Sequence, residues 1–371
     1  MRIGIDARLW NETGVGRYIR SIFEYLPQVD NKNEYVWFFR QKEFDNINLP
    51  LPHWKKVLAD IRWHSLKEQL LLPKIFARER LNLLHFPYFS FPIFYRGKFV
   101  ITIHDLIFDH YKSGRASTLP YPIYLIKKIS YHFILQKALE KATKIITISE
   151  NSKHEILDHY KVDPGKVVVT YESGSLEIPK NITVDNSVIK KQKPYILYVG
   201  NAHPHKNVES LINSMSLIRK RLPKLKLIII GSDNFFFPKL ANYIKVQKMQ
   251  NAAILIGEVP NQKLSLWYQN AECLVSASYM EGFGIPILES MSMGCPTILS
   301  DIPIFHEIAG PAAAYFDPES PQSIANKIVE VVKNLNTRKN LQQKGYERLK
   351  LFSWRKMVEE TVSIYKDVGN K

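Results

Sequence analysis

Two glutamates in the stretch EGFGIPILES, Glu281 and Glu289, stand eight positions apart around a Gly-Phe-Gly turn. Carboxylates accept hydrogen bonds from neighbouring hydroxyls of a sugar, and two of them can also form the acid/base pair of a hydrolase. Pro286 suits the first position of a helix, which would place Glu289 in the first helical turn. The residue types alone therefore leave two chemistries open, sugar binding and hydrolysis.

Residues suited to phosphate chemistry lie elsewhere in the chain. Gly14 and Gly16 follow a short apolar strand and precede a helix, so their backbone can approach a phosphate. A dinucleotide-binding fingerprint would need a third glycine where Ile19 stands, which argues against a nicotinamide or flavin enzyme. Lys206, in GNAHPHKN, follows another strand, and its ammonium can hold a diphosphate. A plain turn and a solvated lysine are the alternatives.

The sequence does not predict a catalytic metal. No two aspartates stand two positions apart, so the Asp-x-Asp arrangement that often holds a divalent ion on a nucleotide diphosphate is missing. No histidine or cysteine cluster has zinc spacing apart from His203 and His205, which have no partner nearby in the sequence. We therefore expect no metal and no bound cofactor.

The elements that must position these residues alternate between strand and helix. Near-continuous apolar strands such as KFVITIHDL and KLKLIIIGS are followed by helical patterns, for example over residues 121–141 and 207–220. This alternation predicts an α/β fold of two Rossmann-like domains with parallel sheets. Ligands collect at the carboxyl ends of such strands, where His104, Gly200 and Glu281 stand.

The domain boundary is expected in a polar, proline-flanked stretch, residues 175–194, which shows neither helical nor strand periodicity. The first domain is expected over residues 1–178 and the second over 190–350. Five strands are expected to complete the second domain, and another amphipathic helix is expected in the tail, over about residues 354–371.

The 371 residues carry a formal charge of +16, which favours an anionic partner such as an anionic membrane surface or a phosphorylated small molecule. No nucleic-acid-binding signature is present, so nucleic acid is not an expected partner. No signal peptide or long apolar run is found, and Cys273 and Cys295 lie in apolar contexts. These features predict a reduced cytoplasmic protein.

With these motifs assembled, the chain resembles the retaining glycosyltransferases of family four. EGFGIPILESMSMGCP looks like their E-x7-E signature, TGVGRY like their N-terminal glycine loop, and TIHDL like the motif that carries an active-site histidine. YVGNAHPHKN is similar to the phosphate motif of their second domain, and FSWRKMVEETVSIY to a helix that crosses back to the first. The resemblance runs through most of the chain and implies the GT-B fold, two facing Rossmann-like domains with a cleft between them.

The resemblance also implies a role for each matching residue. Glu289 would bind the ribose hydroxyls of the nucleotide, and Glu281 would hold the donor sugar together with the turn formed by Gly282, Phe283 and Gly284. Transfer would be metal-independent, with the acceptor hydroxyl and the leaving phosphate on the same face of the sugar.

The phosphate and reaction-centre positions follow from the same resemblance. Lys206 would bind the diphosphate with help from Gly14 and Gly16, and His104 would sit near the donor sugar and the reaction centre. Asn201, counted among the donor-binding positions, departs from the pattern because family members often carry arginine there. In the family that arginine pairs with the lysine on the phosphates. In this chain the second positive group would come from His203, His205 or Arg8, or Lys206 alone would bind the phosphates. The stretch YESGS also departs from the usual form and receives no role.

The pattern looks most like members that use GDP-mannose in polysaccharide or O-antigen assembly, with UDP- and dTDP-sugars as alternatives. The acceptor, a glycan or a lipid-linked oligosaccharide, is expected on the first domain. There the aromatic-rich residues 85–98 can stack on sugars or form a buried loop, and the basic helix over residues 121–139 can contact anionic lipid or lie in the core. The favoured account of the charge is peripheral attachment to the inner face of the cell membrane. A nucleotide-sugar epimerase or hydrolase, or a non-catalytic binding protein, remains open.

Overall fold

The computed structural model describes residues 1–110, 121–174, 176 and 187–369. The chain divides into two compact units, which are described separately. Unit 1 contains the residues up to His110, those from Tyr121 to Glu172, and the C-terminal stretch from Ser353; unit 2 runs from Ser173 to Phe352. The described residues therefore form an α/β fold of two domains, each built on a parallel sheet.

The sheet of unit 1 has the strand order β3-β2-β1-β4-β5-β6-β7. Every neighbouring pair is parallel, as in the register Ile3 to Tyr35 and Ile3 to Leu83. Because the chain adds β2 and β3 on one side of β1 and the later strands on the other, the order reverses between β1 and β4. The strands are β1 (Arg2–Asp6), β2 (Glu34–Phe39), β3 (Lys55–Leu58), β4 (Leu83–Phe86), β5 (Phe99–Ile103), β6 (Lys144–Thr147) and β7 (Val167–Val169).

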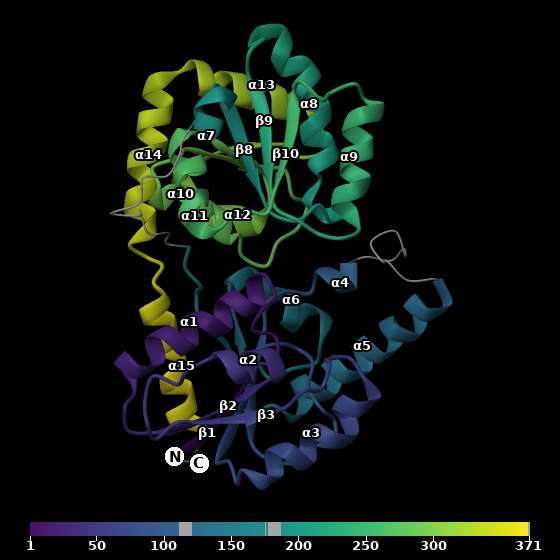
Figure 1. Ribbon diagram of the computed structural model, residues 1–371, viewed down its shortest axis with the longest axis vertical. Helices are drawn as coiled ribbons and strands as arrows, with labels where there is room; N and C mark the ends of the chain where they lie inside the picture. The colour runs from purple at the N-terminus through teal and green to yellow at the C-terminus, as the bar shows by residue number, and fades with distance from the viewer. Residues whose placement is uncertain (111–120, 175, 177–186, 370–371) are drawn as a thin grey trace. The chain divides into compact units, whose positions relative to one another are not determined.

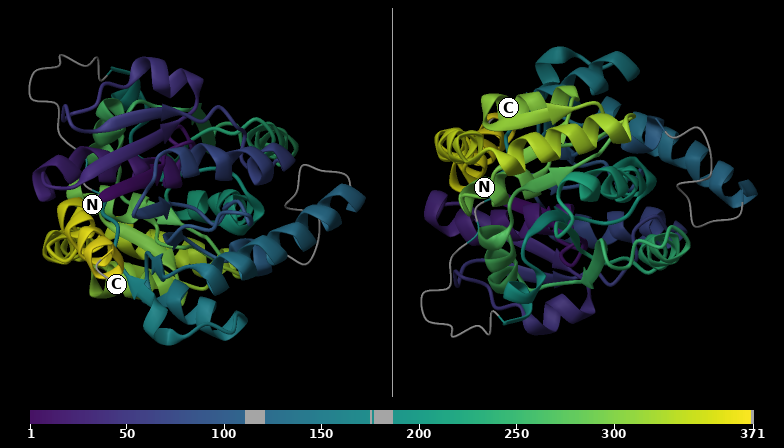
Figure 2. Two further views of the ribbon diagram at one scale, coloured as in Figure 1. Left: turned by 90° about the horizontal axis from the view of Figure 1, so that it is seen from below. Right: turned by 90° about the horizontal axis from the view of Figure 1, so that it is seen from above.

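Helices cover the strands of unit 1 (Figures 1 and 2). They are α1 (Gly14–Val29), α2 (Gln41–Asn46), α3 (Leu66–Arg78), α4 (Ile107–His110), α5 (Tyr121–Lys141), α6 (Glu150–His159) and α15 (Trp354–Gly369). Local capping explains several of their starts: the Ser65 hydroxyl accepts a hydrogen bond from the Glu68 amide, and the Ser149 hydroxyl accepts one from the Ser152 amide.

The C-terminal helix α15 belongs to unit 1, where it packs beside α1 (Figure 1). Its buried face includes Met357, Val358, Val362 and Tyr365. The Tyr365 hydroxyl lies 2.6 Å from His85 Nδ1, on β4. The end of the chain is therefore part of the core that supports the central strands of unit 1.

Unit 2 repeats the design with the strand order β10-β9-β8-β11-β12-β13, which reverses between β8 and β11. Its strands are β8 (Tyr195–Val199), β9 (Lys226–Ile230), β10 (Ala253–Gly257), β11 (Leu274–Ser276), β12 (Thr297–Ser300) and β13 (Ala313–Phe316). Its helices are α7 (Ser187–Gln192), α8 (Val208–Arg221), α9 (Phe236–Val246), α10 (Asn261–Asn270), α11 (Ile285–Ser292), α12 (Pro303–Ala309), α13 (Pro321–Lys333) and α14 (Leu335–Leu349), and the short 3₁₀ turn η3 spans Pro204–Lys206.

Two expectations about the elements were wrong, and one strand was missed. Unit 2 is not complete after five strands, because β13 pairs with β12 as a sixth. The linker stretch contains a helix, α7, although residues 175 and 177–186 of that stretch lie outside the described residues. The edge strand β3, KKVL, also went unpredicted, since it is half exposed and lacks apolar periodicity.

Candidate functional site

The first set of candidate residues lies in unit 2, where the strand order reverses. Lys206 ends η3, which follows β8, and Glu281 lies in the loop that follows the neighbouring strand β11. Lys206 Nζ is 2.6 Å from Glu281 Oε2, and the Ser278 hydroxyl donates to Glu281 Oε1 at 2.7 Å. Two residues 75 positions apart in the chain are thus paired at the sheet edge where α/β proteins bind ligands.

Glu289 projects from α11 into the interior of unit 2. Its side chain is buried, and the Tyr268 hydroxyl, from α10, donates to Glu289 Oε2 at 2.8 Å. Ile285 is the first residue of α11 and Pro286 the second, so Glu289 is the fifth and lies in the second turn. The expectation of a first-turn position was wrong because the helix starts directly after Gly284.

The Gly-Phe-Gly turn sets where α11 begins. Gly284 is its N-cap with φ of +97°, a conformation that side chains rarely adopt, and a Cβ there would lie 2.9 Å from Ile287 Cδ1. Phe283 is buried and meets the ring of Phe352 edge to face at 5.8 Å, while Gly282 is buried next to Glu281. The turn is therefore fixed by packing on both sides.

The loop after β8 requires close backbone contact. Gly200 has φ of +151°, and a Cβ on Gly231, after β9, would lie 2.0 Å from the Gly200 carbonyl oxygen. Asn201 follows, and its Oδ1 accepts a hydrogen bond from the His203 amide at 3.4 Å. The Asn201 side chain thus shapes the loop that carries Lys206.

The three candidates for a second positive group lie in different environments. Burial, followed by the charge of Lys206, lowers the pKa of His205 to about 2. Burial also lowers the pKa of His203. Arg8 belongs to unit 1, where its buried guanidinium donates to Asp6, Glu68 and the Ile61 carbonyl. Within the loop from Gly200 to Asn207, burial thus disfavours the charged form of both histidines, and Lys206 is the residue paired with a carboxylate.

In unit 1, the glycine stretch after β1 is not a free loop. Helix α1 begins at Gly14, with Thr13 as its N-cap, so both glycines lie in its first turn rather than before it. A Cβ on Gly16 would lie 2.5 Å from the Trp10 carbonyl oxygen, whereas Gly14 has open space around it. Gly16 therefore permits close packing of the loop on the helix, and Gly14 leaves the helix N-terminus accessible.

His104 follows β5 and is almost fully enclosed in unit 1. Its Nε2 lies 3.0 Å from the carbonyl oxygen of Pro87, which follows β4, and its Nδ1 lies 3.3 Å from Glu172 Oε1. The ring of Tyr18, from α1, meets the His104 ring edge to face at 5.0 Å. Burial lowers the pKa of His104, but Glu172, Pro87 and Asp105 raise it more, so the net pKa is raised.

A second buried histidine, His85 on β4, lies in a different environment. Its Nδ1 is 2.6 Å from the Tyr365 hydroxyl, and its Nε2 is 2.8 Å from the Thr102 hydroxyl. Burial, together with the charge of His104, lowers the pKa of His85 to about 3. His85 is therefore a neutral core histidine.

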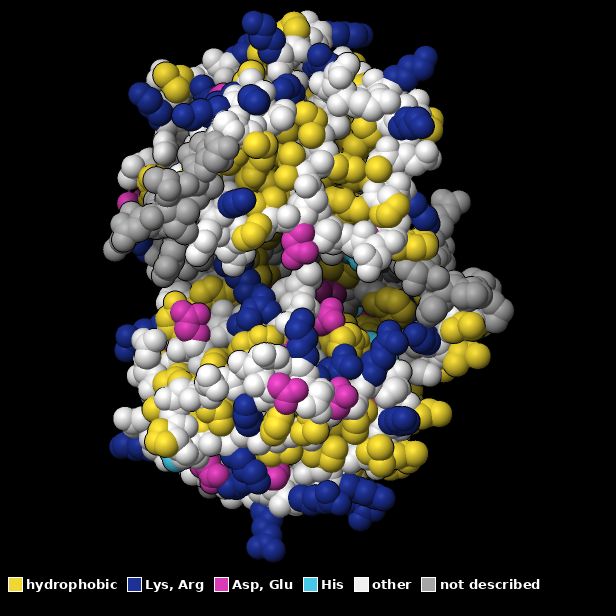
Figure 3. All heavy atoms as spheres, viewed as in Figure 1, with side chains coloured by type: hydrophobic (Ala, Val, Ile, Leu, Met, Phe, Trp, Pro, Cys, Tyr) yellow, Lys and Arg dark blue, Asp and Glu magenta, His cyan; other side chains and the backbone are white. Residues whose placement is uncertain are grey.

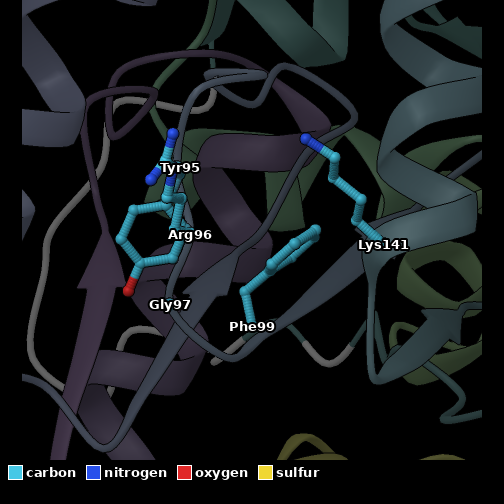
Figure 4. Close-up of a pocket in the computed structure, with 5 residues that line it drawn as sticks. All are labelled: Tyr95, Arg96, Gly97, Phe99 and Lys141. Carbon is cyan, nitrogen blue, oxygen red and sulfur yellow. The ribbon is translucent and has the colours of Figure 1, made fainter.

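Unit 1 contains a cavity beside His104 and another at the opposite edge of its sheet. A small one, of about 60 Å³, lies beside His104 and Asp105 and is lined by aromatic rings that include Tyr88, Phe89 and Tyr131. A larger one, of about 300 Å³, lies between Tyr95, Phe99 and Lys141 (Figure 4). Since Phe99 opens β5 and Lys141 ends α5, the larger cavity is at the amino ends of the strands, away from the candidate residues.

The aromatic stretch over residues 85–98 is mostly a buried loop. Phe86 and Phe91 are fully enclosed and Tyr95 nearly so, whereas Phe94 is exposed. In the described part of the chain, no group of three or more acidic, histidine or cysteine side chains is arranged to hold a metal ion. The same residues contain no helix with the length and apolar character needed to cross a membrane.

Sequence reasoning missed three residues whose side chains form ion pairs or hydrogen bonds with the candidate side chains. Glu172, in the YESGS stretch that received no role, pairs with His104. Ser278 donates to Glu281, and Tyr268 donates to Glu289. The positions of Glu172 and Ser278 shortly after strands were a usable signal, while nothing in the sequence around Tyr268 marks it.

Each unit matches a known family model. Residues 13–172 match Glycosyltransferase Family 4, and residues 180–348 match Glycosyl transferases group 1. The two matched stretches leave out only residues 1–12, 173–179 and 349–371.

The chain is also similar in sequence to glycosyltransferases. The chain is 29% identical over 232 residues to O-antigen chain mannosyltransferase RfbU of Salmonella typhimurium, over 62% of this chain and 60% of that protein. It is 29% identical over 241 residues to O-antigen chain mannosyltransferase B of Escherichia coli, over 62% of each chain. The matched stretch thus spans about three-fifths of the length of these relatives.

Among solved structures, sucrose-phosphate synthase from Thermosynechococcus elongatus superposes with a TM-score of 0.81 at 17% identity, covering 99% of both chains. A likeness at this identity shows the shared two-domain fold. The family matches cover most of both units, and by them the chain belongs to the glycosyltransferases.

Proposed function

We propose that the chain is a retaining glycosyltransferase that moves a sugar from a nucleotide-sugar donor to a hydroxyl of a glycan or lipid-linked acceptor. The observation that carries the proposal is the pairing of Lys206 with Glu281 where the strand order of unit 2 reverses, with Glu289 on the helix that follows. A cation and two carboxylates match the diphosphate, sugar and ribose of such a donor.

In this proposal, Lys206 binds the diphosphate, Glu281 accepts hydrogen bonds from the donor sugar, and Glu289 accepts them from the ribose. The spacing of the two glutamates is that of the E-x7-E signature. Ser278 and Tyr268 support this assignment, because each donates to one of the carboxylates and so restricts its orientation.

Transfer with retention requires stabilisation of a departing diphosphate and of an oxocarbenium-like sugar, chiefly by preorganised electrostatics. Lys206 supplies positive charge where the diphosphate leaves, and Glu281 supplies negative charge near the sugar. The leaving phosphate accepts the proton of the acceptor hydroxyl, so no enzyme nucleophile and no metal ion is required. Activity is accordingly expected to persist in EDTA.

The proposed donor is GDP-mannose, and the proposed process is cell-surface polysaccharide or O-antigen assembly. The support comes from the two O-antigen chain mannosyltransferases, each 29% identical over part of the chain.

A thermal-shift panel of GDP-, UDP- and dTDP-sugars tests the donor. A ligand that binds the native state alone raises the unfolding free energy by about 2.7 kcal/mol at one hundred times its Kd. GDP-mannose is expected to raise the Tm with increasing concentration, with or without EDTA. A clear response to a UDP-sugar and none to GDP-mannose would overturn the donor assignment.

The proposed acceptor side includes a membrane contact through α5. This helix exposes Ile126 and Ile129, which are 65% and 62% accessible, together with Ile123, Leu125 and Phe133. Lysines interleave with them, and Glu140 is the one acidic residue of the helix. Apolar side chains among cations suit an anionic lipid surface. Lys and Arg also lie elsewhere on both units (Figure 3), so positive charge alone does not single out α5. The exposed apolar side chains of α5 support the contact.

Co-sedimentation with vesicles tests this contact. The chain is expected to bind vesicles rich in phosphatidylglycerol, and Ile126→Glu with Ile129→Glu is expected to weaken binding by at least about tenfold, since each isoleucine contributes about 1.5–3 kcal/mol when buried. Leu335→Glu, at an exposed position of α14 in unit 2, is the control that should leave binding unchanged. Equal binding by all three proteins would contradict the α5 contact.

A further inference from the structure

Each ring nitrogen of His104 lies close to an oxygen atom of unit 1. Nε2 is 3.0 Å from the Pro87 carbonyl oxygen, and Nδ1 is 3.3 Å from Glu172 Oε1. A neutral imidazole carries one N–H and would turn a lone pair toward one of these oxygens. A doubly protonated ring suits both contacts, so the geometry favours the imidazolium.

Glu172 is a buried carboxylate that is stabilised by a neighbouring positive charge. Its side chain is 3% exposed, and its Oε1 has no hydrogen-bond partner among the described residues. A buried carboxylate without a compensating charge is costly, and His104 is the cation beside it. The two groups therefore stabilise each other in their charged forms.

The other charged and titratable groups around His104 agree with this assignment. Asp105, next in the chain, also raises the pKa of His104. His85 stays neutral and Tyr18 stays protonated, because burial lowers the pKa of the first and raises that of the second. Glu172 and Asp105 thus place negative charge next to the His104 ring.

We propose that Glu172 is a positioning residue that keeps His104 as a fixed imidazolium, so that His104 acts through its positive charge and not as the proton acceptor in sugar transfer. This role rests on the proposed function and on the family resemblance, which implies that His104 lies near the reaction centre. Because Nε2 donates to the Pro87 carbonyl oxygen and Nδ1 is protonated beside the Glu172 carboxylate, no ring lone pair is left to take the proton of an acceptor hydroxyl. That proton then goes to the leaving phosphate.

The direct test is the titration of the histidine side chains by ¹⁵N NMR, with the His104 signals assigned from His104→Gln. In the native chain, the His104 midpoint is expected above about pH 6.5, the ordinary histidine value. In Glu172→Gln it is expected below that value, because burial then acts without the carboxylate. Glu172→Asp is expected to restore a raised midpoint.

His85 serves as the internal control, since its ring is expected to remain neutral in every variant and its signals report that unit 1 is folded. A native His104 that is half-titrated below pH 6.5, or a midpoint unchanged by Glu172→Gln in folded protein, would overturn the proposal. If Glu172→Gln does not fold, the titration of the native chain alone decides.

Kinetics separate this proposal from the proposed function. Glu172→Gln is expected to keep the donor-induced thermal shift, because the donor site is in unit 2, and to lose about 10- to 100-fold in kcat, the value of a charge-assisted contact. As the pH is raised, the activity of Glu172→Gln is expected to fall at a lower pH than the activity of the native chain does, because His104 then loses its proton earlier. Absence of donor binding and transfer in the native chain would refute the proposed function, while the NMR midpoints would still decide the state of His104.

Discussion

Replacing Lys206 with methionine is expected to lower kcat/KM for the nucleotide-sugar donor by about 100- to 1,000-fold, as loss of one preorganised electrostatic contact does in other enzymes. The effect is large because burial lowers the pKa of both neighbouring histidines of the loop, which disfavours their charged forms as replacements for the ammonium. Initial rates of nucleotide release, measured over a range of donor concentrations, check it. Methionine keeps most of the apolar stem, so the change is chiefly one of charge.

Two further variants make this result specific. Lys263→Met removes an exposed charge from α10 of the same unit and should leave kcat/KM unchanged. In the absence of donor, Lys206→Met leaves Glu281 without its cation, and the double variant Lys206→Met with Glu281→Gln should recover part of the lost unfolding free energy. Native rates in Lys206→Met would exclude the lysine from diphosphate binding.

The second large effect is expected at Glu289. Glu289→Gln should raise the donor Kd about 10- to 100-fold, because a charge-assisted hydrogen bond contributes about 1.5–3 kcal/mol. Calorimetric titration of both proteins with donor gives the Kd. Glutamine nearly keeps the shape of the side chain and an oxygen for the Tyr268 hydroxyl, so the unfolding free energy should change little.

Tyr268→Phe is the matched control for Glu289. It removes the 2.8 Å hydrogen bond to the carboxylate but leaves the charge, so it should weaken donor binding less than Glu289→Gln does. Glu289→Ala is less informative, since it opens a cavity and leaves the buried tyrosine hydroxyl unpaired, at a cost of about 1–3 kcal/mol in stability. Equal donor affinity in the native chain and Glu289→Gln would remove Glu289 from the donor site.

The α/β class was predictable because the central strands are near-continuous apolar runs. Strands such as β5 and β9, buried on both faces, leave a pattern that survives without knowledge of their neighbours. The edge strands β3 and β13 leave no such apolar pattern in the sequence. KKVL is half exposed, and the middle of AAYF is only partly buried, so their pairing is decided by the sheet that they join.

The candidate site was predictable to the level of residue positions, not of contacts. Motifs placed Lys206 and Glu281 after strands, and parallel topology brings the ends of β8 and β11 together. The 2.6 Å contact between the two side chains depends on loop geometry that no local pattern encodes. Glu172 illustrates the limit, because its partner His104 comes from a strand two places away in the sheet.

The cleft between the two domains and the combined action of His104 with the donor-binding residues stay predictions. For the aromatic stretch over residues 85–98, the structure favours a buried loop over a surface that stacks on sugars. Phe86 and Phe91 are enclosed, and Phe94 is exposed.

A crystal structure of the chain with GDP-mannose, grown in the presence of EDTA, would show directly whether the donor binds to these residues. The diphosphate is expected on Lys206 Nζ, the ribose hydroxyls on Glu289 and the donor sugar on Glu281. Donor bound at another site, or bound here through a metal ion with Lys206 still paired only to Glu281, would contradict it.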